Sequence, residues 1–289
     1  MNTGKSVSRR NFLQGAVGVA GATAISSMVQ SSESRKTPLL IGMCDWNLGK
    51  TANVEAIALA REIGLDGVEV SLNSSKDEVY LRRSEMQEIY RNAMYKYGIM
   101  IPSIAIGELN RVPLKSEPKT ALWVADSIKV ARNLGAKNIL MAFFGKGELK
   151  IDKPEEIDRV VDVLKELAPD AKKAGVVLGI ENTLSAEDNL KILERINSPA
   201  VQIYYDAKNS AGGKFDVIKE IKMLKGHICQ AHLKNGKLHL SQKEDVDFVA
   251  LAQAFKESGY DGWYVLETSS PNNLITDTKA NIEFVKKYY

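Results

Sequence analysis

The feature that most constrains this chain is an alternation, repeated eight times, of short apolar segments with longer amphipathic ones. Residues 39–44 and 52–64 form the first pair, and residues 263–268 and 277–289 form the last. Helical periodicity marks the amphipathic segments, and many of them end in the glycine that caps a helix C-terminus (Gly64, Gly98, Gly135, Gly175, Gly226 and Gly259). Regular alternation of strands and helices predicts a parallel sheet with right-handed crossovers.

Eight such units predict an α/β fold, the (β/α)8 TIM barrel, over residues 38–289. The rival is a doubly wound open sheet, which favours a GxGxxG turn after its first strand. The corresponding turn here is "DWNLGKTAN", residues 45–53, and it lacks that pattern. The sequence therefore favours the closed barrel.

The N-terminal segment, residues 1–30, has the pattern of an export signal and a tether. Arg9 and Arg10 precede Phe12 and Leu13, and a weakly apolar run rich in glycine and alanine follows. This order resembles a twin-arginine signal. The alternative is a transmembrane anchor, but the run at residues 15–29 is short for a span of about 20 residues. We expect an exported, periplasmic protein without a stable membrane anchor.

The charge balance argues against nucleic acid as a partner. Removing Lys5, Arg9 and Arg10 with a signal cut after Ala24 leaves 36 of the 39 basic residues, which equals the 36 acidic ones. A chain without net charge has no electrostatic reason to bind nucleic acid or anionic membrane. A small-molecule partner is expected instead, and the sequence leaves an oligomer open.

The two cysteines, Cys44 and Cys229, fall in the predicted first and seventh strands. One strand would then separate them, which places their Cα atoms roughly 9–10 Å apart. A disulfide requires less than about 7 Å, so we expect two free, buried thiols even though export permits a disulfide.

One metal-capable side chain stands at the end of each of the last four predicted strands: Glu181, Asp206, His232 and Glu267. The C-terminal ends of barrel strands meet at one mouth, where active sites lie. Any one of these residues alone would suit a helix cap, a loop or a hydrogen-bonded core position. Together, three carboxylates and an imidazole suit Mn²⁺, Mg²⁺ or Co²⁺; Zn²⁺ is also compatible, although structural zinc prefers more Cys and His.

Strand alternation supports an inward direction for these side chains. If Asp206 points into the barrel, Tyr204 does too, whereas Tyr205 faces the helices. If His232 points inward, Cys229 is expected to face the helices. The outward positions are apolar or small, as helix packing requires.

The motifs "GIEN", "YYDAKN", "AHLKN" and "YVLET" around these four positions resemble the metal-binding strand ends of the xylose isomerase-like TIM barrels. That superfamily includes sugar phosphate isomerases/epimerases and ketose 3-epimerases. The resemblance extends over the whole barrel, including "CDWNLGK" and "LAREIGLDGVEVSL". It implies that Glu181, Asp206, His232 and Glu267 bind a divalent metal, that Glu181 and Glu267 move the proton, and that the metal stabilises an enediolate.

The chain departs from the epimerase pattern at two positions. A second histidine is usual three residues after the aspartate, where this chain has Asn209, which cannot share a proton at neutral pH. A substrate-binding arginine is usual a few residues after the metal histidine, where this chain has Lys234, Lys237 and His239 instead. Glu187 does match a substrate-contacting glutamate, although it also suits the first turn of a helix.

Two further residues are candidates for substrate binding, each with a structural alternative. Trp46 could stack on a sugar ring or pack in the core. Glu69 has inward parity and could face the pocket or form a buried ion pair. Lys234 could instead form a Schiff base, as in class I aldolases.

The leading functional prediction is a metal-dependent isomerase or epimerase of a non-phosphorylated sugar or polyol. The loops after strands seven and eight lack a glycine-rich phosphate cradle. A lyase, dehydratase or keto-glycoside-cleaving enzyme would use the same enolate chemistry, and a non-catalytic carbohydrate-binding barrel is a second alternative. An abasic-site endonuclease would need more than three histidines and a basic groove.

Overall fold

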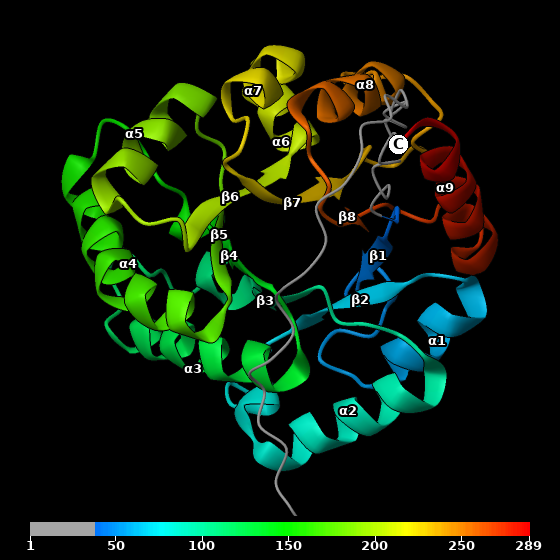
Figure 1. Cartoon of the computed structure of the whole chain (residues 1–289), viewed down its shortest axis with the longest axis horizontal. Helices are drawn as coiled ribbons and strands as arrows, with labels where there is room; N and C mark the ends of the chain where they lie inside the picture. Colours follow the sequence, from blue (N-terminus) through cyan, green and yellow to red (C-terminus); the bar gives the residue numbers. More distant parts are fainter. Residues whose placement is uncertain (1–37) are drawn as a thin grey trace, which may run out of the picture. The chain divides into compact units, whose positions relative to one another are not determined.

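The computed structural model describes residues 38–289 and shows a closed barrel of parallel strands in sequential order (Figure 1). The strands are β1 (Ile41–Cys44), β2 (Gly67–Ser71), β3 (Ser103–Ile106), β4 (Asn138–Ala142), β5 (Val177–Glu181), β6 (Val201–Asp206), β7 (Ile228–Leu233) and β8 (Tyr264–Leu266). Hydrogen bonding between β8 and β1 closes the ring. The predicted (β/α)8 TIM barrel is confirmed.

Helices follow the strands and surround the ring in Figure 1. They are α1 (Glu55–Ile63), α2 (Ser84–Tyr97), α3 (Lys119–Leu134), α4 (Pro154–Ala174), α5 (Ala186–Ile196), α6 (Ala207–Gly212), α7 (Val217–Met223), α8 (Phe248–Ser258) and α9 (Leu274–Tyr288). Short 3-10 helices η1 (Tyr80–Arg82), η2 (Gly107–Asn110) and η3 (Gly145–Gly147) lie in the loops. The sequence patterns predicted the long helices but missed α6 and the 3-10 turns.

The predicted export signal and tether, residues 1–30, lie outside the described residues. Within residues 38–289, none of the helices combines the length and apolar character needed to cross a membrane.

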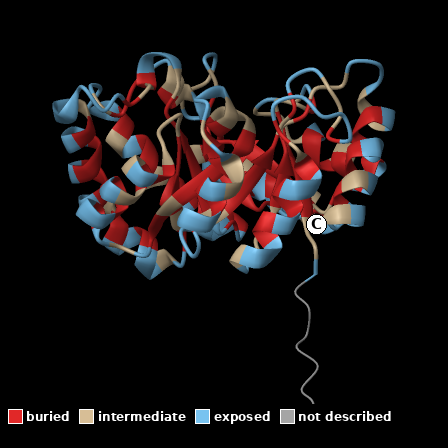
Figure 2. Ribbon diagram, turned by 90° about the horizontal axis from the view of Figure 1, so that it is seen from above, coloured by how far each residue is buried: buried red, intermediate tan, exposed pale blue. Residues whose placement is uncertain are grey.

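The core has two layers, which Figure 2 shows as buried strands covered by the inner faces of the helices. A large apolar cluster fills the space between sheet and helices, while a small one inside the barrel consists of Ala105, Leu140, Ala142 and Tyr204. The rest of the barrel interior carries buried polar side chains, including Glu69, Gln230 and His232. The sheet thus buries apolar residues outward and reserves part of its interior for polar groups.

A β-bulge between β6 and β7 corrects one expectation about side-chain direction. The register pairs Ile203 with Ile228 but Tyr204 with Gln230, so Cys229 is the extra residue. Cys229 packs against the cluster inside the barrel, and its Sγ would lie 2.9 Å from a Cβ added to Gly179. The prediction that Cys229 faces the helices is therefore wrong, because the bulge breaks the alternation.

Both cysteines are free, as expected. Cys44 is buried, whereas Cys229 is only partly buried, so the expectation of two buried thiols is correct for Cys44 alone.

Candidate functional site

Four side chains from consecutive strands converge at the C-terminal mouth of the barrel. Glu181 ends β5, Asp206 ends β6, His232 lies near the end of β7, and Glu267 directly follows β8. One ligand atom from each lies within 4.8 Å of the others. Nδ1 of His232 is 3.1 Å from Oε1 of Glu181 and 3.5 Å from Oε2 of Glu267. Residues spread over 86 positions of the chain, from 181 to 267, thus share one small volume.

The two oxygens of Asp206 have different environments. Oδ1 accepts hydrogen bonds from the backbone N–H groups of Lys208 (2.7 Å) and Asn209 (3.0 Å) and so caps α6. Oδ2 is buried and has no hydrogen-bond partner. A buried carboxylate oxygen without a hydrogen-bond donor is costly unless a cation compensates it. The cap therefore holds Asp206 with Oδ2 turned toward a positive charge, and the Lys234 ammonium lies 3.2 Å from it.

Neighbouring polar groups orient the two glutamates. Trp46 Nε1 donates to Glu267 Oε1 (3.3 Å), and Lys234 Nζ donates to Glu267 Oε2 (2.8 Å). The same ammonium lies 3.2 Å from Asp206 Oδ2. Asn209 Nδ2 donates to Glu181 Oε1 at 3.3 Å. Trp46, Lys234 and Asn209, all predicted from the sequence, are thus in contact with the candidate ligands.

Burial and neighbouring charges act in opposite directions on the pKa values of Glu181, Glu267 and His232. Burial raises the pKa of Glu181 to about 7, although His232 acts to lower it. Burial also acts to raise the pKa of Glu267, but the positive charges of His232 and Lys234 bring it below its ordinary value. Burial disfavours the His232 imidazolium, yet the surrounding acidic groups raise the pKa of His232 well above its usual value. Glu181 and His232 therefore hold a proton more readily than they would in water, whereas Glu267 does not.

The residues fit a divalent metal ion. Three carboxylates and one imidazole nitrogen form the donor set, and within it the buried Asp206 Oδ2 accepts no hydrogen bond and faces the Lys234 ammonium at 3.2 Å. Hard and borderline cations such as Mg²⁺, Mn²⁺ and Co²⁺ prefer oxygen-rich sets of this kind. Glu181, Asp206, His232 and Glu267 are the residues that could hold such an ion.

A cavity of about 320 Å³ opens beside these four side chains. Trp46, Asn209 and Lys234 line it together with Glu181 and Glu267. Its opposite wall comes from the ends of the first four strands and includes residues that the sequence reasoning missed: Ser71, Asn73, Glu108, Asn110 and Phe144. Their position at or just after the ends of β2, β3 and β4 was the available signal, but ordinary loop residues occur at the same places.

Two other predicted substrate-binding residues do not line this cavity. Glu187 lies in the first turn of α5, is exposed, and pairs with Lys191 at 3.0 Å, so its role in substrate binding stays a prediction. Glu69 is completely buried beneath the site, with Oε1 2.9 Å from His232 Nε2. Of the two alternatives predicted for Glu69, this geometry matches a buried pair, here with His232, rather than a residue that faces the pocket.

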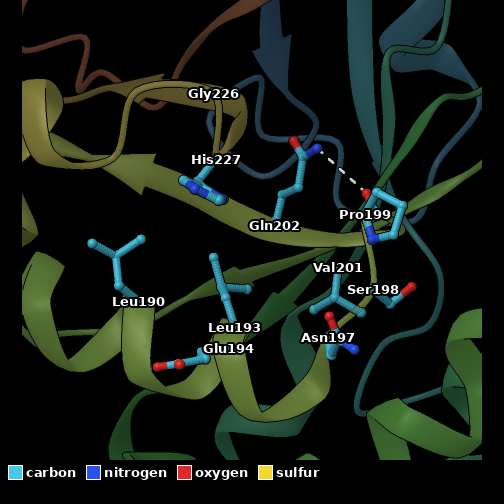
Figure 3. A pocket seen from close by; sticks show the side chains of 10 residues that line it. All are labelled: Leu190, Leu193, Glu194, Asn197, Ser198, Pro199, Val201, Gln202, Gly226 and His227. Carbon is cyan, nitrogen blue, oxygen red and sulfur yellow. Dashed lines mark hydrogen bonds between the residues drawn. The ribbon is translucent and has the colours of Figure 1, made fainter.

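A second cavity, of about 530 Å³, lies at the opposite ends of the strands (Figure 3). It is bounded by α5, by the segment leading into β6 and by Gly226 and His227 before β7. Gln202 Nε2 donates to the Pro199 carbonyl at its edge (3.4 Å). Among the described residues, no group of potential metal ligands lies there. The candidate metal ligands therefore lie beside the smaller of these two cavities.

Comparisons with known proteins agree with this architecture. A family model described as "Xylose isomerase-like TIM barrel" matches residues 57–288. No curated protein matches the sequence.

Several solved structures have the same fold. L-ribulose 3-epimerase is 19% identical with a TM-score of 0.72, over 86% of this chain and 94% of the other. D-allulose 3-epimerase from Methylomonas sp. is 17% identical with a TM-score of 0.70, over 88% and 98%. A 3-keto-D-glucoside 4-epimerase from E. coli is 14% identical with a TM-score of 0.69, over 86% and 100%.

At these identities the structural likeness establishes the fold, while the family model covers most of the sequence itself. The strand order and the closed barrel agree with it. This chain therefore belongs to the xylose isomerase-like TIM barrel family.

Proposed function

We propose that this protein is a metal-dependent isomerase or epimerase of a non-phosphorylated sugar or polyol. The observation that carries the proposal is the convergence of Glu181, Asp206, His232 and Glu267 beside a cavity large enough for a small ligand. Relatives of the same fold include enzymes named as epimerases of ribulose, allulose and a keto-glucoside. The oxygen-rich donor set, rather than the fold alone, points to metal-assisted proton transfer.

The reaction requires that a proton leave and return at the carbon next to a carbonyl. Glu181 and Glu267 both line the cavity and are the carboxylates that would remove and return it. When bound, the divalent ion supplies positive charge for the enediolate oxygens. Lys234 and Asn209 also line the cavity and donate hydrogen bonds, so they would orient the substrate's oxygens. Trp46 would form one wall and hold Glu267 in place.

The proposal is tested by incubating Mn²⁺-loaded protein with a panel of ketoses and keto-glycosides in D₂O. We expect one deuterium at the carbon next to the carbonyl, and a product that otherwise has the mass of the substrate, detected by NMR and mass spectrometry. A carbohydrate-binding barrel would bind a sugar without deuterium incorporation, and that result across the panel would overturn the proposal.

A lyase or dehydratase on the same site is the second candidate, and Asn209 is the observation that favours it. Asn209 donates to Glu181 at 3.3 Å, where a histidine would offer an additional proton carrier. Elimination requires no return of the proton to the same carbon. Loss of water or of an aglycone in the mass spectrum would select this candidate.

We extend the proposal to the location of the protein. Arg9 and Arg10, which lie outside the described residues, are the basis for proposing that the protein is exported to the periplasm. Replacing both with Lys should leave the protein in the cytoplasm, because the twin-arginine pair is the recognised feature of such a signal. Cell fractionation followed by immunoblotting measures this, and unchanged export of the double variant would contradict it.

A further inference from the structure

A buried polar cluster lies directly beneath the candidate metal ligands, inside the barrel. Cys44, Glu69 and His232 bring ligand-type atoms within 4.8 Å of one another. Cys44 and Glu69 are 0% exposed, and His232 is 1% exposed. His232 belongs to this cluster through Nε2, whereas its Nδ1 faces Glu181 and Glu267. The imidazole thus connects the mouth of the barrel with its interior.

Hydrogen bonds occupy both oxygens of Glu69. Oε2 accepts from the hydroxyls of Ser103 and Tyr204, the latter at 2.6 Å. Oε1 lies 2.9 Å from His232 Nε2, with Cys44 Sγ at 3.6 Å. A buried carboxylate with this many donors is stabilised as an anion without a metal ion. The cluster therefore has the character of a hydrogen-bonded support rather than of a second metal site.

The direction of these hydrogen bonds follows from Gln230. Asn138 Nδ2 donates to Gln230 Oε1 at 2.7 Å, which orients the Gln230 amide. Gln230 Nε2 then donates to Ser103 Oγ (2.7 Å) and to Tyr204 Oη (2.6 Å). Each hydroxyl accepts a hydrogen bond there, so its single hydrogen is available for Glu69.

The same reasoning fixes the hydrogen on His232. Glu69 receives two hydroxyl donors on Oε2, and Cys44 Sγ, which lies 3.4 Å from His232 Nε2, donates to Glu69 Oε1. Oε1 is therefore the acceptor that faces His232 Nε2 at 2.9 Å. The hydrogen of a neutral imidazole then lies on Nε2, and the lone pair lies on Nδ1. Nδ1 is the nitrogen near Glu181 and Glu267. A metal-binding histidine commonly donates its other N–H to a carboxylate in this way.

We propose that Glu69 is a positioning residue that holds the hydrogen of His232 on Nε2 and so presents Nδ1 to the metal. Asn138 donates to Gln230, and Gln230 donates to the hydroxyls of Ser103 and Tyr204. These hydrogen bonds, which cross the barrel, direct the hydrogens of the two hydroxyls toward Glu69. This inference rests on the metal site of the proposed function. It adds that the site depends on a carboxylate from β2, which does not line the cavity.

The test compares Mn²⁺ binding by Glu69→Gln and by Asp45→Asn, measured by isothermal titration calorimetry on the purified protein. Glu69→Gln keeps the side-chain shape but replaces one carboxylate oxygen with an NH₂ donor. In one amide orientation this donor faces the hydroxyl donors of Ser103 and Tyr204, and in the other it faces His232 Nε2–H. We expect Mn²⁺ affinity to fall about 10- to 100-fold, the range for a lost outer partner of a metal ligand. Asp45 is the matched control, because it is also 0% exposed and accepts from a serine hydroxyl, Ser71 (2.7 Å). Asp45→Asn should leave Mn²⁺ affinity unchanged.

Nitrogen-15 NMR of the histidines gives a second readout that a merely structural role would not move. In wild-type protein loaded with diamagnetic Zn²⁺ or Mg²⁺, His232 should carry its hydrogen on Nε2 and show the ligation shift on Nδ1. The sequence has only His227 and His239 besides, so His227→Gln and His239→Gln assign the signals. A hydrogen on Nδ1, or Mn²⁺ affinity of Glu69→Gln within about twofold of wild type, would overturn the proposal.

These experiments separate the two levels of the argument. If Glu69→Gln does not fold, the wild-type spectrum alone decides which nitrogen carries the hydrogen. If wild-type protein binds no divalent metal, the proposed function fails. The spectrum of metal-free protein then still shows whether His232 Nε2–H donates to Glu69, and absence of that hydrogen bond would overturn the positioning role.

Discussion

Replacing Glu267 or Glu181 with glutamine is expected to lower the rate of deuterium exchange next to the substrate carbonyl by about 10²- to 10⁴-fold. An amide has nearly the shape of the carboxylate but cannot accept a proton at neutral pH. Both side chains line the cavity, so each variant removes one of the two carboxylates proposed to move the proton. The measurement is NMR-detected exchange in D₂O with Mn²⁺ at a concentration that saturates each variant.

Glu187→Gln is the control for this prediction. Glu187 is exposed and pairs with Lys191 outside the cavity, so its loss should leave exchange unchanged. A large effect of Glu187→Gln would instead support the substrate-binding role predicted from the sequence. Exchange that stays within about tenfold of wild type in both metal-loaded cavity variants would contradict the assignment of Glu181 and Glu267 as the proton-transferring groups.

The second large effect concerns Asp206→Asn, which is expected to weaken Mn²⁺ binding by more than about 100-fold, beyond the effect of losing an outer partner. An asparagine Oδ1 can still accept from the N–H groups of Lys208 and Asn209, so the cap of α6 survives. Its NH₂ group, however, would face the ammonium of Lys234 and the cation, because it takes the place of Oδ2. Calorimetric titration measures the affinity, and thermal unfolding reports whether the fold is retained.

Asp216→Asn is the matched control, since Asp216 caps α7 through the same two kinds of backbone contact, to Ile218 and Lys219, and is exposed. It should bind Mn²⁺ as wild type does. Mn²⁺ affinity of Asp206→Asn within about threefold of wild type would exclude Asp206 as a ligand.

The same titration should depend on pH in a defined direction. Burial raises the pKa of Glu181 to about 7, so protons occupy this carboxylate as the pH falls through that value. Metal ligands must be deprotonated, and the raised pKa of His232 adds a second proton that the ion must displace. Apparent Mn²⁺ affinity in wild type should therefore fall as the pH falls to and through 7, with protons released on binding. Titrations in buffers of different ionisation enthalpy measure that release.

The sequence by itself determined the barrel. Strand-length and helix-length segments alternate regularly, and each period buries apolar residues on the side that its partner covers, so local pattern and global fold agree. It also placed Glu181, Asp206, His232 and Glu267 at one mouth. In a parallel barrel the end of each strand is the same end of the sheet, which makes this convergence a consequence of topology.

The tertiary structure alone decided which atoms meet. Glu69 and His232 are 163 positions apart and touch because β2 and β7 project into the same interior. The bulge at Cys229 reversed the expected direction of one side chain, and α6 was missed because a six-residue helix depends on its cap at Asp206 more than on periodicity. Local pattern fixes which face a residue favours. Only the closed barrel fixes distances across that face, because those distances depend on strand register and on side chains from the far wall.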